Sequence, residues 1–181
     1  MTTVWTRTCS PAPSSELEWR CYEDVDYGFA ISHPESWQVR TPINRTSSDD
    51  PAVIVRRHEF SGSEGAVDLD IWLGSQPDIV AWLEEMNSIS GSRLFPSMEP
   101  NATVGGHPAV VHIMDPDSHH SMFTVFFGEG THIYRLWYTM SCREGGLSTV
   151  RRMLDSIRFS PEPIPAEIPD DVWQQALRIC E

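Results

Sequence analysis

The stretch that most constrains the fold is YGFAISHPESW, at residues 27–37. Phe29 and Ile31 alternate with small residues, so both bulky apolar side chains fall on one face of a strand. Pro34 ends this strand, because proline donates no hydrogen bond to a ladder, and Trp37 begins the next strand. The stretch therefore predicts a hairpin made of a strand, a proline turn and a second strand that opens with a buried tryptophan.

The rest of the chain alternates between strand and helix patterns. Ser75 followed by Asp78 is typical of a helix N-cap, and Gly91 is expected to end that helix. Three consecutive strand patterns then precede a second helix, so the order predicts an α+β fold: an antiparallel sheet with helices on both faces, an α/β/α sandwich. Further strands are predicted at residues 19–22, 52–60, 66–73, 109–114, 122–128 and 132–140, and helices at 75–91 and 147–157.

The length of 181 residues suits one domain with two tails. Residues 1–17 are a Ser/Thr/Pro-rich leader, and residues 18–160 contain the sandwich domain. Residues 161–181 form a proline-rich linker and a short helix capped by Asp170 or Asp171, which is expected to pack back onto the domain through Trp173.

The charge of the chain excludes two classes of partner. The net charge is −13, and all 13 basic residues are arginines. Nucleic acids and anionic membrane surfaces both attract basic proteins, so neither is an expected partner. No stretch reaches the roughly 20 apolar residues of a membrane helix, so no transmembrane segment is expected.

The four cysteines, Cys9, Cys21, Cys142 and Cys180, lie at the edges of predicted elements and form no C-x-x-C pair. Two disulfides are one interpretation, and pairing Cys9 with Cys21 and Cys142 with Cys180 involves the least crossing of the chain. The other two connectivities stay open. The alternative is four unpaired thiols in a cytosolic protein.

The segment TCSPAPSS at residues 8–15 resembles the tether that follows the lipidated cysteine of bacterial lipoproteins. Arg7 stands where a lipoprotein signal has a small residue, so either a leader has been removed or the resemblance is chance. An extracytoplasmic or cell-envelope location is the expectation, and a cytoplasmic one is the alternative.

Four motifs together resemble the PsbP-like superfamily, over roughly residues 20–160. They are the stretch at 27–37, GGHPAVV at 105–111, the strand pair from FF at 126–127 to YRL at 134–136, and MLDSIRF at 153–159. The superfamily includes the extrinsic photosystem II protein PsbP, the Ran guanine-nucleotide-release factors and DcrB-like bacterial lipoproteins. The resemblance implies an α/β/α sandwich with a non-catalytic binding or assembly role, and it transfers no site residue and no cofactor.

One loop carries a pattern that is compatible with metal binding. Asp115, Asp117, His119 and His120 combine carboxylates with imidazoles, which suit divalent transition metals. Adjacent histidines point in opposite directions on an extended backbone, and Asp-Pro-Asp-Ser is also ordinary turn chemistry. A solvated turn is therefore the competing interpretation.

Aromatic residues in the predicted strands are the candidates for a partner interface. Trp72, Trp137 and Tyr138 are singled out because the two tryptophans lie out of phase with the apolar neighbours that define the inward faces. The competing interpretation places them in the core. Asp68 and Asp70 share the strand face opposite the apolar one, which suits solvent exposure or a cation.

Three functions follow from these patterns. The first is a non-enzymatic PsbP-like module that binds a protein partner outside the cytoplasm, and the second is a cytosolic partner-binding chaperone or regulator of the same fold. The third is a metal carrier or metal-dependent enzyme that uses the loop from Asp115 to His120. The sequence shows no nucleophile elbow and no phosphate-binding glycine loop, so catalysis is not expected.

Overall fold

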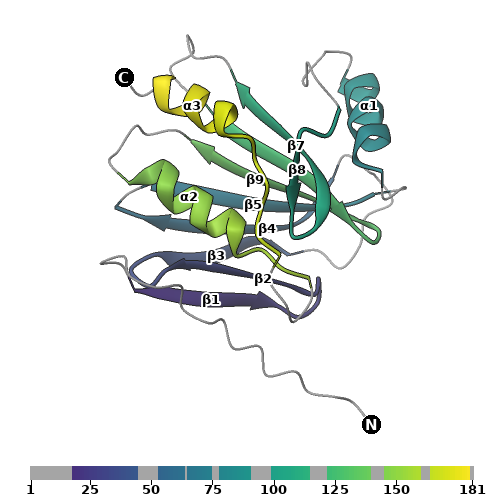
Figure 1. Ribbon diagram of the computed structural model, residues 1–181. Coiled ribbons are helices and arrows are strands. Elements are labelled where there is room, and N and C mark those ends of the chain that lie inside the picture. The colour runs from purple at the N-terminus through teal and green to yellow at the C-terminus, as the bar shows by residue number, and fades with distance from the viewer. Residues whose placement is uncertain are drawn as a thin grey trace.

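The computed structural model describes residues 18–44, 53–63, 65–74, 78–90, 99–114, 122–139, 145–159 and 164–179. Nine strands and three helices are present in these ranges (Figure 1). In chain order they are β1 (Trp19–Asp24), β2 (Phe29–Pro34), β3 (Gln38–Asn44), β4 (Ile54–Gly62), β5 (Gly65–Leu73), α1 (Ile79–Ser90), β6 (Ala102–Val104), β7 (His107–Met114), β8 (Met122–Glu129), β9 (His132–Thr139), α2 (Gly146–Asp155) and α3 (Asp170–Ile179).

The strands form a large sheet and a small one, and every pair is antiparallel. The large sheet has seven strands in the order β3-β4-β5-β9-β8-β7-β6, and the small sheet pairs β1 with β2. Figure 1 shows α2 and α3 lying across the large sheet and α1 apart from them, near β7 and β8. The predicted α+β architecture is confirmed. None of the described helices is long and apolar enough to cross a membrane.

The main core lies on the face of the large sheet that we call the inner face. The β1–β2 hairpin, α2 and α3 all contribute to it, because each presents one apolar side to the sheet. Trp173 of α3 stacks on Phe123 of β8 with ring centroids 4.9 Å apart, so the C-terminal helix packs back through Trp173 as predicted.

A smaller apolar cluster lies on the opposite face, which we call the outer face. Trp82 and Leu83 of α1 pack there against alternate residues of the strands. The rings of Trp82 and Trp72 lie 5.3 Å apart, and Phe126 lies 6.2 Å from Trp82. Each face of the sheet therefore has its own helix layer, and α1 covers the β7–β8 end of the outer face.

The hairpin predicted from residues 27–37 is wrong in its pairing. β2 pairs with β1, whereas β3 crosses to the large sheet and pairs with β4. The proline turn itself forms, with the Trp37 amide donating to the Pro34 carbonyl at 3.0 Å. Trp37 is buried as expected, and a Cβ on Gly62 would lie only 2.2 Å from its ring. The turn therefore connects two sheets.

The first helix also begins at a different residue from the one predicted. Asp78 occupies the N-cap position of α1, because its Oδ1 accepts a hydrogen bond from the Val80 amide at 2.9 Å. Ser75, the predicted cap, lies outside the described residues. Asp78 instead fills the role that the capping-box pattern gave to Ser75.

Candidate functional site

Part of the outer face is not covered by α1. Two cross-strand rows of charged and aromatic side chains run over β4, β5 and β9 in this part. In one row Arg57, Asp70 and Arg135 lie opposite one another, and in the other Glu59, Asp68 and Trp137 do so. We call these six residues the open strip. None of these six residues belongs to the apolar cluster that α1 contacts.

Asp70 is the centre of the open strip, and its side chain has no exposed surface. Arg57 Nε donates to Asp70 Oδ1 at 2.5 Å, and Arg135 Nη2 donates to Oδ2. Trp137 Nε1 donates to the same Oδ2 at 3.2 Å. A buried carboxylate needs this many partners, because desolvation penalises an uncompensated charge.

Trp137 is a half-buried ring held in a fixed position. Its indole nitrogen is bonded to Asp70, and the guanidinium groups of Arg135 and Arg57 lie 5.5 and 6.0 Å from its ring centroid. Cation–π attraction and one hydrogen bond therefore fix both the tilt and the position of the ring. The side chain is ordered before any partner arrives.

Glu59 and Asp68 are the two carboxylates of the open strip that Asp70 leaves without arginine partners. They lie directly opposite each other on β4 and β5, and no described residue forms a hydrogen bond or an ion pair with either carboxylate, although the charge of Arg57 acts on both. Burial raises the pKa of Asp68 to about 6; the charge of Arg57 opposes this shift, while Glu59 and Asp70 add to it. The folded protein therefore disfavours the ionised form of the half-buried Asp68 side chain.

The structure separates the three aromatic residues predicted for the interface. Tyr138 is 1% exposed in the main core, so its prediction as an interface residue is wrong. Trp72 is 6% exposed and lies under α1, so it is also a packing residue. Trp137 alone of the three keeps a partly exposed side chain. The alternation of side chains along each strand correctly places both tryptophans on the outer face. The position of α1 then decides that Trp72 is covered and Trp137 is not.

The other predicted site residues lie mostly outside the described part of the chain. Asp115, Asp117, His119 and His120 all do, so the metal prediction is not tested, and no group of three metal-ligating side chains occurs among the described residues. Cys21 lies in β1, whereas Cys9, Cys142 and Cys180 lie outside the described residues. The disulfide pairing of these cysteines therefore stays a prediction.

A second polar cluster, which the sequence did not reveal, lies buried between the β1–β2 hairpin and the inner face. His58 Nε2 lies 2.9 Å from Asp24 Oδ2, and its Nδ1 lies 3.1 Å from the Tyr22 hydroxyl and 3.2 Å from Thr41 Oγ1. Arg56 reaches Asp24 at 3.4 Å. His58 is 0% exposed, so this cluster fastens two layers together. The isolated histidine of the sequence gave no sign of these partners.

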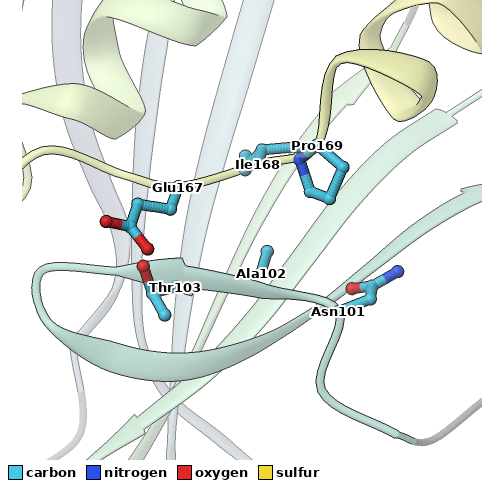
Figure 2. Close-up of a pocket in the computed structure, with 6 residues that line it drawn as sticks. All are labelled: Asn101, Ala102, Thr103, Glu167, Ile168 and Pro169. Carbon is cyan, nitrogen blue, oxygen red and sulfur yellow. The ribbon is translucent and has the colours of Figure 1, made fainter.

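A shallow groove of about 420 Å³ lies at the other end of the molecule, beside the edge strand β6 (Figure 2). Thr103 and Glu167 exchange two backbone hydrogen bonds of 2.9 Å across it. The Asn101 side-chain amide is bonded to both backbone groups of Val111. The hydrogen-bonding groups that line the groove are therefore largely bonded to other groups of the protein. This makes the groove a weaker candidate than the open strip.

The comparisons with known proteins give the chain no family. No family model matches it, and no curated protein matches it. Among solved structures, a Bacteroides thetaiotaomicron VPI-5482 protein is 10% identical with a TM-score of 0.43, covering 72% of this chain and 44% of that chain. The chain thus spans less than half the length of that protein.

A second solved structure is cyanobacterial PsbP (CyanoP) from Synechocystis sp. PCC 6803. It is 12% identical with a TM-score of 0.40, and the alignment covers 83% of this chain and 97% of that chain. This neighbour bears the name of the superfamily that the motifs resemble. TM-scores at this level carry no argument about family, site or activity, so membership stays a prediction.

Proposed function

We propose that this protein is a non-catalytic binding or assembly module that contacts a protein partner through the open strip. The observation that carries the proposal is Trp137, a partly exposed aromatic ring that Asp70 holds in place on a part of the sheet that none of the described helices covers. A preordered ring loses little conformational entropy on binding, which favours affinity. Tryptophan and arginine, which the strip combines, are enriched at the centres of protein interfaces.

The environments of Asp70 and His58 support the non-catalytic part of the proposal. The oxygens of Asp70 are bonded to donors of three residues, and His58 is enclosed in a cluster with 0% exposure. A general acid or base must come within hydrogen-bond reach of a substrate. Neither group offers this reach, so both act in packing and orientation.

An extracytoplasmic location is a separate part of the proposal. The lipoprotein-like segment at residues 8–15 and the even number of cysteines, which suits disulfides, support it, because disulfides persist in oxidising compartments. Mass measurement of the native protein after alkylation without reductant tests it. Alkylation of all four cysteines would contradict the proposal.

A photo-crosslinking amino acid placed at residue 137 tests the binding function. The full chain is expressed in its own organism with benzoylphenylalanine replacing Trp137, and irradiated cells are examined for adducts. Val25 is the matched control position, because it is 84% exposed at the β1–β2 turn, away from the open strip. One adduct of defined mass is expected from position 137 and none of that mass from position 25.

Competition decides whether that adduct is specific. Excess unlabelled wild-type protein should abolish the adduct, whereas excess Trp137→Ala protein should leave it. If both positions give the same adducts, or if the two competitors act equally, the open strip is not the contact surface.

A further inference from the structure

We infer that the open strip recognises an arginine side chain presented by a protein partner, whose guanidinium stacks on Trp137 and is bound by Asp68 and Glu59. This inference rests on the proposed binding function and adds the chemistry of the partner. It is carried by the charge left over in the strip, by the placement of the three side chains and by the charge of the whole chain.

The charge balance of the open strip leaves two acceptors unused. Asp70 takes the hydrogen bonds of both strip arginines, so Arg57 and Arg135 are directed toward it. Glu59 and Asp68 then face each other, and among the described residues Arg57 acts on both through its charge without a hydrogen bond or an ion pair to either carboxylate. Arg40 is the register partner of Glu59 on β3, but its guanidinium donates to Gln38 at 3.4 Å. An external cation would complement this pair of carboxylates.

The placement of these groups favours arginine over lysine. Glu59, Asp68 and Trp137 are consecutive members of one row across three adjacent strands. Neighbouring strands are about 4.8 Å apart, so a planar guanidinium can donate to a carboxylate while its flat face lies on the indole. A lysine ammonium is a compact point charge and does not make the same stacked, two-pronged contact.

The net negative charge of the whole chain also favours a basic partner. At −13 the protein attracts basic partners over distances of about a Debye length, which speeds encounter with them. An acidic segment would meet repulsion both from the strip carboxylates and from the net charge. A second copy of this chain carries the same negative charge, so self-association through the strip is disfavoured.

Fluorescence anisotropy with defined peptides tests the inference on the full chain. Labelled hexa-arginine, hexa-lysine and hexa-glutamate are titrated with wild-type protein and with the double variant Glu59→Gln/Asp68→Asn. The matched control is Glu84→Gln/Glu99→Gln, which removes the same charge from two exposed positions outside the strip. Sedimentation velocity of the protein alone checks for self-association.

Hexa-arginine should bind more tightly than hexa-lysine, and hexa-glutamate should not bind. The strip double variant should weaken hexa-arginine binding roughly tenfold or more, and the control by less than about twofold. Trp137→Phe should reduce the preference for arginine while leaving the fold intact, as circular dichroism would show.

Three outcomes would overturn the inference: equal losses in both double variants, equal affinity for arginine and lysine, or a dimer that the strip variant dissolves. Cross-linking from position 137 separates the two proposals. If the specific adduct forms but the arginine preference is absent, the partner chemistry is wrong and the binding function stands. If the adduct is also absent, the surface itself is wrong.

Discussion

Asp68 and Asp70 show how much two positions on one strand face can differ. Both point to the outer face of β5, yet Asp70 is fully buried and accepts hydrogen bonds from three residues, whereas Asp68 is half-buried and its carboxylate has no bonded partner among the described residues. The sequence placed both on the polar face and offered solvent exposure or a cation. In the structure Asp70 is buried and bonded to Arg57, Arg135 and Trp137, whereas Asp68 stays partly exposed and its pKa is raised by burial.

Asp70→Asn should destabilise the protein by roughly 3 kcal/mol, because it removes the buried carboxylate to which both Arg57 and Arg135 are bonded. Urea unfolding at neutral pH measures the change. The exposed variant Glu84→Gln should stay within about 0.5 kcal/mol of wild type. Equal effects of the two substitutions would show that Asp70 does not anchor the strip.

Asp68→Asn should have the opposite effect and depend on pH. The folded pKa of Asp68 is raised from 3.8 to about 6, so the folded state holds the proton more tightly than the unfolded state does. Ionisation of Asp68 therefore lowers stability as pH rises through this window. Burial and the charges of Glu59 and Asp70 cause this loss, and the charges of Arg57 and Arg135 reduce it.

The asparagine variant avoids this loss, and its gain should be on the order of 1 kcal/mol above about pH 7 after allowance for solvent screening. The gain should shrink as pH falls toward the unfolded pKa of 3.8 and vanish well below it, where the wild-type carboxyl is protonated in both states. Thermal unfolding between these limits tests it. A gain that does not change with pH would show that ionisation of Asp68 is not its cause.

At the level of elements, the β1–β2 hairpin is a separate layer that needs fastening to the sheet. Two backbone hydrogen bonds link Ala30 with Arg158, and the cluster of His58, Asp24 and Arg56 joins the hairpin to β4. The sequence predicted the strand 19–22 and the strand after residue 27 as separate features. Their pairing with each other was not predicted, because the turn between them, DVDYG, carries no short hairpin signal.

Asp24→Asn should loosen this layer in a pH-dependent way. Burial alone would raise the pKa of Asp24, but hydrogen bonds from His58 and the Tyr27 amide, together with the charge of Arg56, lower it overall. A lowered folded pKa means that the carboxylate stabilises the protein above its unfolded pKa, and that this stability is lost as pH falls through the folded value.

The variant should therefore cost about 1–2 kcal/mol at neutral pH and progressively less in acid. Hydrogen exchange should speed up in β1 and β2 and stay unchanged in β8. A uniform increase across all strands would instead mean that the hairpin unfolds together with the large sheet.

The stacking of Trp173 on Phe123 is the main contact that we expect to hold the C-terminal helix α3 on the sheet. Trp173→Ala removes the stack on Phe123 and should cost about 3 kcal/mol. Limited proteolysis should then cut within residues 164–179 much faster than in wild type. Leu177→Ala, at a position that is 45% exposed on the same helix, should leave both stability and the cleavage pattern nearly unchanged.

At the scale of the whole molecule, the two faces of the large sheet differ in what covers them. The inner face is covered by the hairpin, α2 and α3, and holds most of the large buried side chains. Among the described helices only α1 packs on the outer face, and it leaves the open strip uncovered. An acidic chain with one partly uncovered polar and aromatic face suits a binding module.

The sequence by itself determined the fold class, most of the elements and the face to which each strand residue points. Alternation has a period of two, so Val67, Leu69 and Ile71 could be assigned to one face and Asp68 and Asp70 to the other without knowing any neighbour. The helix at 147–157 and the packing of Trp173 onto the domain are likewise predictable from the sequence, because an amphipathic stripe is a local pattern.

Only the tertiary structure decided which strands pair and which outward residues remain uncovered. Pairing depends on contacts between residues far apart in the chain, and a strand pattern is the same whichever partner it has. That is why the sequence pattern predicts that β2 pairs with β3 rather than with β1, and why it does not distinguish Trp72 from Trp137. The position of α1 over one end of the sheet buries Trp72 and leaves Trp137 partly exposed, and the candidate site follows from that difference.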